Sequence, residues 1–248
     1  MENTHLIQLS RQVALRRELD VIANNIANIN TAGFKGDGAM FEQYLMPVAR
    51  AEEFARPDRQ LSYVQDRGSY INAAQGALQQ TGSPLDVAID GEGLFVVATP
   101  QGERYTRAGG LQINAANQLV TADGHPVLGD AGPIQFQDRD RDITIGRDGT
   151  ISVPDGIRGR LRVVTFGSMQ ELVKEGSGLF VAPDGAAPLP VANPRVVQGA
   201  IERSNVEPVT EMARMIDVTR TYTMIAGMIQ QQSDMRRTAI ERLADVPL

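Results

Sequence analysis

The stretch Leu15–Lys35, LRRELDVIANNIANINTAGFK, decides how the chain is expected to fold. Its apolar residues recur at alternating steps of four and three, which places them on one side of a helix: Leu15, Leu19, Ile22, Ile26 and Ile29. Beside this stripe stand the asparagines Asn24, Asn25, Asn28 and Asn30. Because an asparagine amide competes for backbone groups and disfavours helix, the asparagines predict polar contacts outside the helix. Gly33 is expected to close the helical pattern in a left-handed conformation.

The predicted N-terminal helix, residues 3–30, carries apolar residues on other sides as well. Two further strips run along it, one formed by Leu6, Leu9 and Val13 and the other by Ile7, Ala14 and Val21. A helix with apolar residues on several sides is expected to be surrounded by neighbours.

A second long helix is predicted from about residue 208 to residue 243, with Pro208 in its first turn. Its apolar positions again alternate steps of three and four: Met215, Val218, Tyr222, Ile225 and Ile229. Such a helix would be about 54 Å long, whereas a β-domain of this size has a radius of gyration of about 14 Å. The helix therefore needs a partner, and the N-terminal helix is the nearest candidate. Five methionines in it favour an adaptable interface.

The middle of the chain changes to a β pattern. Residues 76–198 contain short alternating stretches with frequent turn signals, among them Asp90-Gly91 and Asp148-Gly149. Strands are predicted near residues 85–89, 94–98, 104–107, 111–114, 119–121, 143–145, 150–153, 160–166 and 179–182. This pattern is typical of an all-β meander or distorted barrel.

The predicted fold class is therefore α+β, with two terminal helices that pair like a coiled coil and a central all-β domain. We expect four regions: an N-terminal assembly helix (1–35), an extended connector (36–75), the β-domain (76–198) and a C-terminal assembly helix (199–248). Within the connector, some strand is expected around Leu61–Val64.

Composition excludes several classes of protein. A net charge of −6 and a pI near 5.0 argue against a nucleic-acid partner. The absence of cysteine excludes disulfides and thiol chemistry, and the two histidines leave little room for a metal site or a triad. No run approaches the roughly 20 apolar residues of a membrane span. With no secretory signal expected, the composition suits a cytoplasmic protein or one exported without a cleavable signal.

Candidate chemical sites are weak. The alternate acids of Asp138–Asp142 lack the glycine and the distant glutamate of a calcium loop. Gly91-Glu92-Gly93 stands between two predicted strands, so we interpret it as a hairpin and not as a dinucleotide loop. His125 lies in a turn-like setting and is expected to be structural. We therefore expect no catalytic residue, no cofactor and no metal.

The segment Asn24–Phe34, NNIANINTAGF, resembles the N-terminal signature of the bacterial flagellar axial proteins, among them the basal-body rod proteins. Three further regions resemble the same family in the same order: Pro84–Phe95 with Tyr105–Gly109, Leu119–Gly129, and Gly199–Val206 with Glu211–Ile216. The resemblance implies a structural subunit of the flagellar rod in the periplasm, exported by the type III apparatus and polymerising through its terminal helices. Its implied partners are other rod proteins and copies of itself.

Within the family, the opening segment Met1–Arg17 is more similar to proximal than to distal rod subunits, and the distal rod is the alternative. Residues 223–228, TMIAGM, also favour the proximal rod, since they lack the polar residues of distal rod and hook chains. Two more remote hypotheses remain, a non-catalytic helical adaptor that binds a single partner, and an enzyme with a site in the β-domain.

Overall fold

The computed structural model describes residues 2–45, 62–183 and 185–244. Two long terminal helices contact each other, and the central region consists of small antiparallel sheets, so the predicted α+β class is confirmed. The chain divides into two compact units. We call Met1–Ile26, Asp37–Tyr70 and Pro208–Leu248 the helical unit, and Ala27–Gly36 with Ile71–Glu207 the β-unit.

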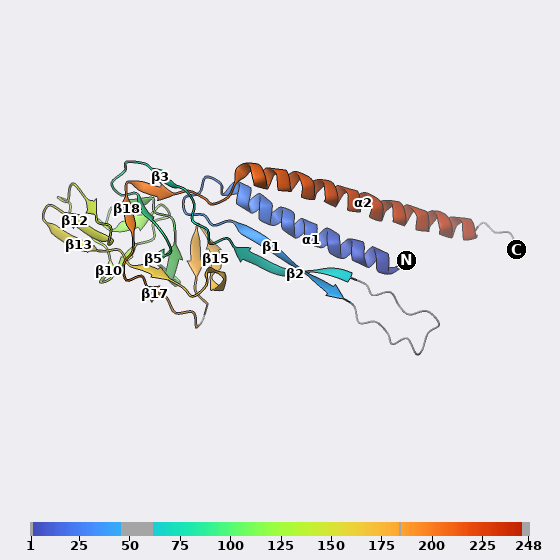
Figure 1. Cartoon of the computed structure of the whole chain (residues 1–248), viewed down its shortest axis with the longest axis horizontal. Helices are drawn as coiled ribbons and strands as arrows, with labels where there is room; N and C mark the ends of the chain where they lie inside the picture. The colour runs from blue at the N-terminus through green and yellow to red at the C-terminus, as the bar shows by residue number, and fades with distance from the viewer. Residues whose placement is uncertain (1, 46–61, 184, 245–248) are drawn as a thin grey trace. The chain divides into compact units, whose positions relative to one another are not determined.

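The helical unit contains α1 (Glu2–Ala27) and α2 (Pro208–Ala244). Figure 1 shows the two helices side by side and running in opposite directions. The unit also holds most of a two-stranded sheet, whose strands β1 (Asp37–Leu45) and β2 (Ser62–Ile71) point in opposite directions. The strand predicted around Leu61–Val64 falls at the start of β2, although Leu61 itself lies outside the described residues.

The N-terminal helix ends earlier than the apolar pattern predicts. Because α1 stops at Ala27, Ile29 is not part of the helical stripe. The reason is local: the Thr31 N–H donates to the Asn28 carbonyl (3.2 Å) and the Thr31 hydroxyl donates to Asn28 Oδ1 (3.1 Å), which forms a turn. Gly33 does have a left-handed φ of 70°, but it lies beyond this turn and does not cap the helix. By contrast, α2 begins at Pro208 as predicted.

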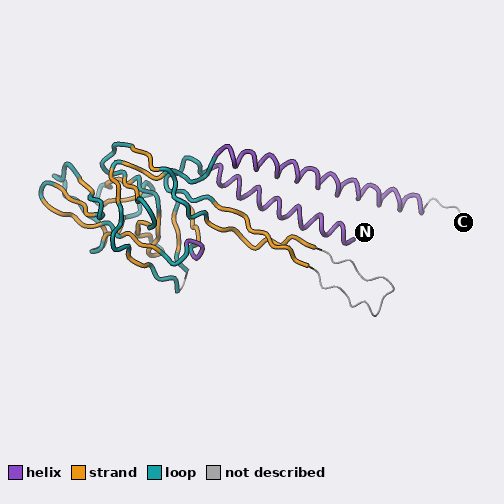
Figure 2. Tube along the Cα trace, viewed as in Figure 1, coloured by secondary structure: helices purple, strands orange, loops and turns teal. Residues whose placement is uncertain are grey.

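The β-unit is built around a six-stranded sheet with the order β15-β16-β6-β5-β14-β17. Its strands are β5 (Leu94–Thr99), β6 (Gly102–Thr106), β14 (Val163–Thr165), β15 (Val173–Gly176), β16 (Leu179–Val181) and β17 (Leu189–Pro190). A short 3-10 helix, η1 (Met169–Glu171), precedes β15. Figure 2 shows the strands of this region among the loops that join them.

Smaller antiparallel sheets complete the β-unit: β3–β19, β4–β18, β7–β8, β9–β10 and β11–β12–β13. Their bounds are β3 (Leu78–Gln80), β4 (Val87–Ile89), β7 (Leu111–Ile113), β8 (Leu119–Thr121), β9 (Leu128–Gly129), β10 (Gly132–Pro133), β11 (Thr144–Ile145), β12 (Thr150–Val153), β13 (Gly156–Arg160), β18 (Val196–Gln198) and β19 (Ala200–Glu202). The predicted strands 119–121 and 150–153 coincide with β8 and β12.

The core of the β-unit lies on both faces of β5. Phe95 and Val97 belong to one apolar cluster, and Leu94 and Val96 belong to another. All four side chains are buried, which explains why β5 reads as a continuous apolar run and not as an alternating one.

The hairpin predicted at Asp90-Gly91 is wrong. β4 pairs with β18, and β5 pairs with β6 and β14, so the loop between β4 and β5 joins different sheets. The carbonyls of this loop bind a buried guanidinium, that of Arg107, which explains why the loop cannot close as a hairpin.

Candidate assembly interface

The most buried side of α1 is adjacent to the predicted stripe and not centred on it. Ala14, Val21 and Ile22 are buried, and Ile22 is the most enclosed at 1% exposure. Three members of the predicted stripe, Leu15, Leu19 and Ile26, are only half-buried, as is Ile29 beyond the helix. The buried side therefore combines Ile22 with the strip of seven-residue spacing, and part of the predicted stripe remains accessible.

On α2 the residues of the predicted apolar stripe match the buried residues more closely than on α1. Val218 and Ile225 are buried, and Tyr222 and Ile229 are half-buried. Met215, at the start of the stripe, is exposed. The two helices are also joined by an ion pair in which Arg214 Nε lies 3.7 Å from Glu18 Oε1.

Both helices expose apolar side chains that nothing in the described subunit covers. On α1 these are Leu6, Leu9 and Val13, which is 60% exposed. On α2 they lie on both sides of the buried stripe, since the helix advances about 100° per residue. One flank carries Met224, Met228 and Met235, and the other carries Met212 and Ile216. Exposed apolar strips of this kind are typical of protein–protein interfaces.

Asn25, one of the asparagines beside the predicted stripe, bonds to backbone outside the helix. Its side chain is buried and bonds the backbone of Asp37 in both directions. The Asn25 amide donates to the Asp37 carbonyl (2.8 Å), and the Asp37 N–H donates to Asn25 Oδ1 (2.9 Å). The predicted polar contact outside the helix is therefore confirmed here, and it joins the last turn of α1 to the first residue of β1. Asn24 is exposed, Asn28 belongs to the turn described above, and Asn30 is exposed in the same turn.

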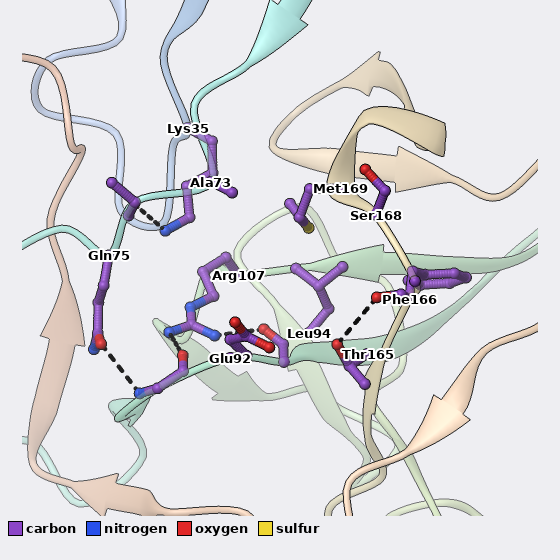
Figure 3. A pocket seen from close by; sticks show the side chains of 14 residues that line it. Lys35, Ala73, Gln75, Glu92, Leu94, Arg107, Thr165, Phe166, Ser168 and Met169 are labelled. Carbon is purple, nitrogen blue, oxygen red and sulfur yellow. Dashed lines mark hydrogen bonds between the residues drawn. The ribbon is translucent and has the colours of Figure 1, made fainter.

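The β-unit also contains a buried charged cluster that the sequence patterns did not indicate, formed by Lys35, Arg107 and Glu202. Glu202 Oε1 accepts from Lys35 Nζ at 2.7 Å, and Glu202 Oε2 accepts from Arg107 Nε. All three side chains are at most 4% exposed. Figure 3 shows Lys35 and Arg107 at the wall of a neighbouring cavity of about 410 Å³.

Every charge in this cluster has additional partners. Arg107 donates to the carbonyl of Ile89, at the end of β4, and to those of Gly91 and Gly93 in the loop between β4 and β5. Lys35 also donates to the Ala74 carbonyl at 2.8 Å. Burial lowers the pKa of Lys35 below its usual value, and the hydrogen bond and charge of Glu202 oppose that shift.

A sequence signal for this cluster did exist. Lys35 directly follows the segment NNIANINTAGF, Arg107 is part of YTRAG, and Glu202 is part of GAIERSNV. Each of the three motifs thus contributes one charged residue, and Lys35 is one of only two lysines in the chain.

The acidic turn near residue 140 is held by arginine. Arg158 donates two hydrogen bonds to the Asp140 carboxylate, which hold the pKa of Asp140 at about 2. Across the residues that the structure describes, no group of three or more His, Cys, Asp or Glu side chains is placed to hold a metal ion. In the same part of the chain, no helix combines the length and the apolar character needed to cross a membrane.

Family models match three parts of the chain. Residues 6–35 match the model described as flagella basal body rod protein, and residues 88–153 match the flagellar hook protein FlgE/F/G D1 domain. Residues 197–242 match the flagellar basal body rod FlgEFG protein C-terminal model. These matches include most of α1, part of the core of the β-unit and most of α2.

Relatives align over nearly the whole chain. The flagellar basal-body rod protein FlgF of Caulobacter vibrioides is 38% identical over 99% of this chain and 100% of its own length. FlgF of Mesorhizobium japonicum is 35% identical over 98% of both chains. FlgG of Bacillus subtilis is 32% identical over 88% of this chain and 90% of its own length.

The chain therefore belongs to the flagellar basal-body rod protein family, whose members are structural and non-catalytic. Within that family it is a FlgF-like rod subunit, because the relatives that it matches over nearly the full chain carry that name.

Proposed function

We propose that this subunit builds the proximal part of the rod, polymerising through its terminal helices into the shaft that transmits motor torque to the hook and filament. Its partners would be other rod proteins and copies of itself. We propose residues 1–35 and 199–248 as the assembly segments, joined by the connector 36–75 to the β-domain 76–198.

The observation that carries this proposal is the exposure of apolar side chains on α1 and on both flanks of α2. An isolated subunit leaves these strips in water, whereas neighbours on more than one side would cover them. A contact of this kind, repeated head to tail between different surfaces of each subunit, generates a helical shaft. The flexible methionines suit neighbours of different sequence.

The half-buried and exposed members of the predicted interface are the ones available to such neighbours: Leu15, Leu19, Asn24, Ile26, Asn28, Ile29, Met215, Tyr222 and Ile229. The buried members, Ile22, Asn25, Val218 and Ile225, would act by holding the helical unit in the shape that the neighbours contact.

We test the helix contacts with Val13→Asp on α1, in cells that lack the natural protein. Val13 is 60% exposed, so the variant should keep the fold of the subunit. A charge in an interface that excludes water is strongly unfavourable, and we expect no rods in isolated basal bodies. Val13→Ile, which keeps the position apolar, is the matched control and should form rods. Rods in normal number with Val13→Asp would contradict the role of α1.

We further propose that the chain is exported by the type III apparatus without a cleavable signal and works in the periplasm, with neither nucleic acid nor membrane insertion. Because the chain contains no cysteine, Ile157→Cys would create a single, exposed thiol. A thiol reagent that crosses the outer but not the inner membrane should label it in exporting cells and not in cells without type III export. Equal labelling in both would contradict this export route.

A further inference from the structure

Three segments of the β-unit meet where the chain continues into the helical unit. The chain passes between the units at residues 26–27, 36–37, 70–71 and 207–208. The segment after α1 (residues 31–36), the segment after β2 (72–76) and the segment before α2 (202–205) are bonded to one another around Glu202. Whatever the arrangement of the two units, a force passed along the chain enters the β-unit through these segments.

Glu202 bonds all three segments at once. Its carboxylate accepts from Lys35 Nζ in the first segment and from the Gly76 N–H in the second (2.9 Å). Its backbone carbonyl accepts from the Gly33 N–H at 2.8 Å. Arg107 is held in the β-unit by its bonds to backbone carbonyls, and it donates to the second carboxylate oxygen of Glu202.

Asn205 repeats this arrangement with uncharged groups. Its Oδ1 accepts from the Gly36 N–H (2.7 Å), and its amide donates to the carbonyls of Asn72 (2.8 Å) and Ala74 (2.9 Å). The Asn72 N–H in turn donates to the Gly36 carbonyl at 2.8 Å. Each segment therefore bonds the other two directly.

Lys174, the second lysine of the chain, fixes the first segment to the six-stranded sheet. From β15 its ammonium donates to the Lys35 carbonyl and lies 4.4 Å from the centre of the Phe34 ring. A cation over an aromatic face adds an attractive contact to the hydrogen bond. The first segment is thus bonded to a strand as well as to the other two segments.

We propose that five residues form a polar clamp: Lys35, Arg107, Lys174, Glu202 and Asn205. The clamp fixes the segment after α1 and the segment before α2 in the β-unit, so that these segments do not slide when force passes between the helices and the β-unit. Buried ion pairs contribute little net stability compared with apolar packing, but breaking one leaves an uncompensated buried charge. The directional bonds therefore specify the positions of the segments more than they stabilise the fold. The force-transmitting part of this proposal rests on the proposed rod function.

The positional part is tested on the purified full-length chain by amide hydrogen exchange, with Glu202→Gln and the exposed control Glu171→Gln. In Glu202→Gln we expect peptides covering residues 33–36 and 72–76 to exchange at least about tenfold faster, while β5 changes less than about twofold. The control should change neither region. An equal increase in β5, or no increase in either region, would overturn the clamp.

Asn205→Ala serves as the second variant, since it leaves the charges intact and removes the three hydrogen bonds of the side chain. It should accelerate exchange in the same two segments, again without affecting β5. If Glu202→Gln fails to fold, this variant alone decides the proposal by the same criteria.

The force-transmitting part is tested in cells that express Asn205→Ala as their only copy. We expect rods to form in normal number but swimming speed to fall more steeply than in the parent as the medium becomes more viscous. Loss of rods, or an unchanged dependence on viscosity, would overturn force transmission by the clamp. If the parent chain itself proved unnecessary for rods, the proposed function would fail while the exchange result on the clamp would stand.

Discussion

Replacing Asn25 by alanine should detach β1 from the end of α1. The substitution removes both hydrogen bonds between Asn25 and the Asp37 backbone, at 2.8 and 2.9 Å. Each bond contributes about 1 kcal/mol, and because Asp37 is only half-buried, the desolvation cost of a group that loses its partner adds at most about 1 kcal/mol. We therefore expect a local destabilisation of about 2–3 kcal/mol, which corresponds to exchange about 30- to 150-fold faster.

The assay is hydrogen exchange at the Asp37 amide, which donates directly to Asn25 Oδ1, followed by NMR or by mass spectrometry of short peptides. Asn30→Ala is the matched control, because Asn30 is an exposed asparagine in the turn after the same helix. It should change the Asp37 amide less than threefold. If Asn25→Ala also changes that amide less than threefold, the buried asparagine does not hold β1, and the reasoning from these two bonds is refuted.

Three further predictions concern stability, each measured by thermal or denaturant unfolding of the full chain. Ile22→Ala should destabilise the helical unit by about 2–5 kcal/mol, because Ile22 is 1% exposed; a loss below about 1 kcal/mol would contradict its burial. Gly33→Ala should cost at least about 1 kcal/mol more than Gly124→Ala: both glycines have positive φ, but a Cβ at Gly33 would lie 2.4 Å from a backbone carbon, whereas at Gly124 it meets nothing. Equal costs would count against that contact. Asp140, with a pKa lowered to about 2, should contribute stability that is present above pH 4 or so and lost as the pH falls towards 2. Asp140→Asn should flatten this pH dependence, and an unchanged profile would count against the bond to arginine.

The helices could be predicted from the sequence because their signal is local. Steps of three and four residues repeat along both termini, and Pro208 marks the start of α2. The end of α1 was missed because Asn28 bonds Thr31 in a turn, a competition that apolar spacing does not register. The stripe predicted from apolar spacing also covers only part of the buried side of α1. It does not include Ala14 and Val21, whose side chains are smaller than those of the leucine and isoleucine stripe beside them.

The charged cluster could not be predicted in the same way. Lys35 and Glu202 are separated by 167 positions, and Arg107 and Glu202 by 95. A single sequence shows three isolated charges, which are usually solvated, and only the fold brings them together. The same contacts explain the wrong hairpin, because Gly91 and Gly93 in the loop after β4 give their carbonyls to Arg107 instead of to a turn.

The most direct test of assembly through the helices is to place charges on one exposed flank of α2. Met224, 65% exposed, and Met228 lie on that flank. In cells lacking the natural protein, the Met224→Asp/Met228→Asp variant should give no rods in isolated basal bodies, although the purified chain keeps its helix content. Met224→Leu/Met228→Leu, which keeps this flank apolar, is the matched control and should give rods. Rods in normal number with the methionine variant would contradict assembly through this face of the helix.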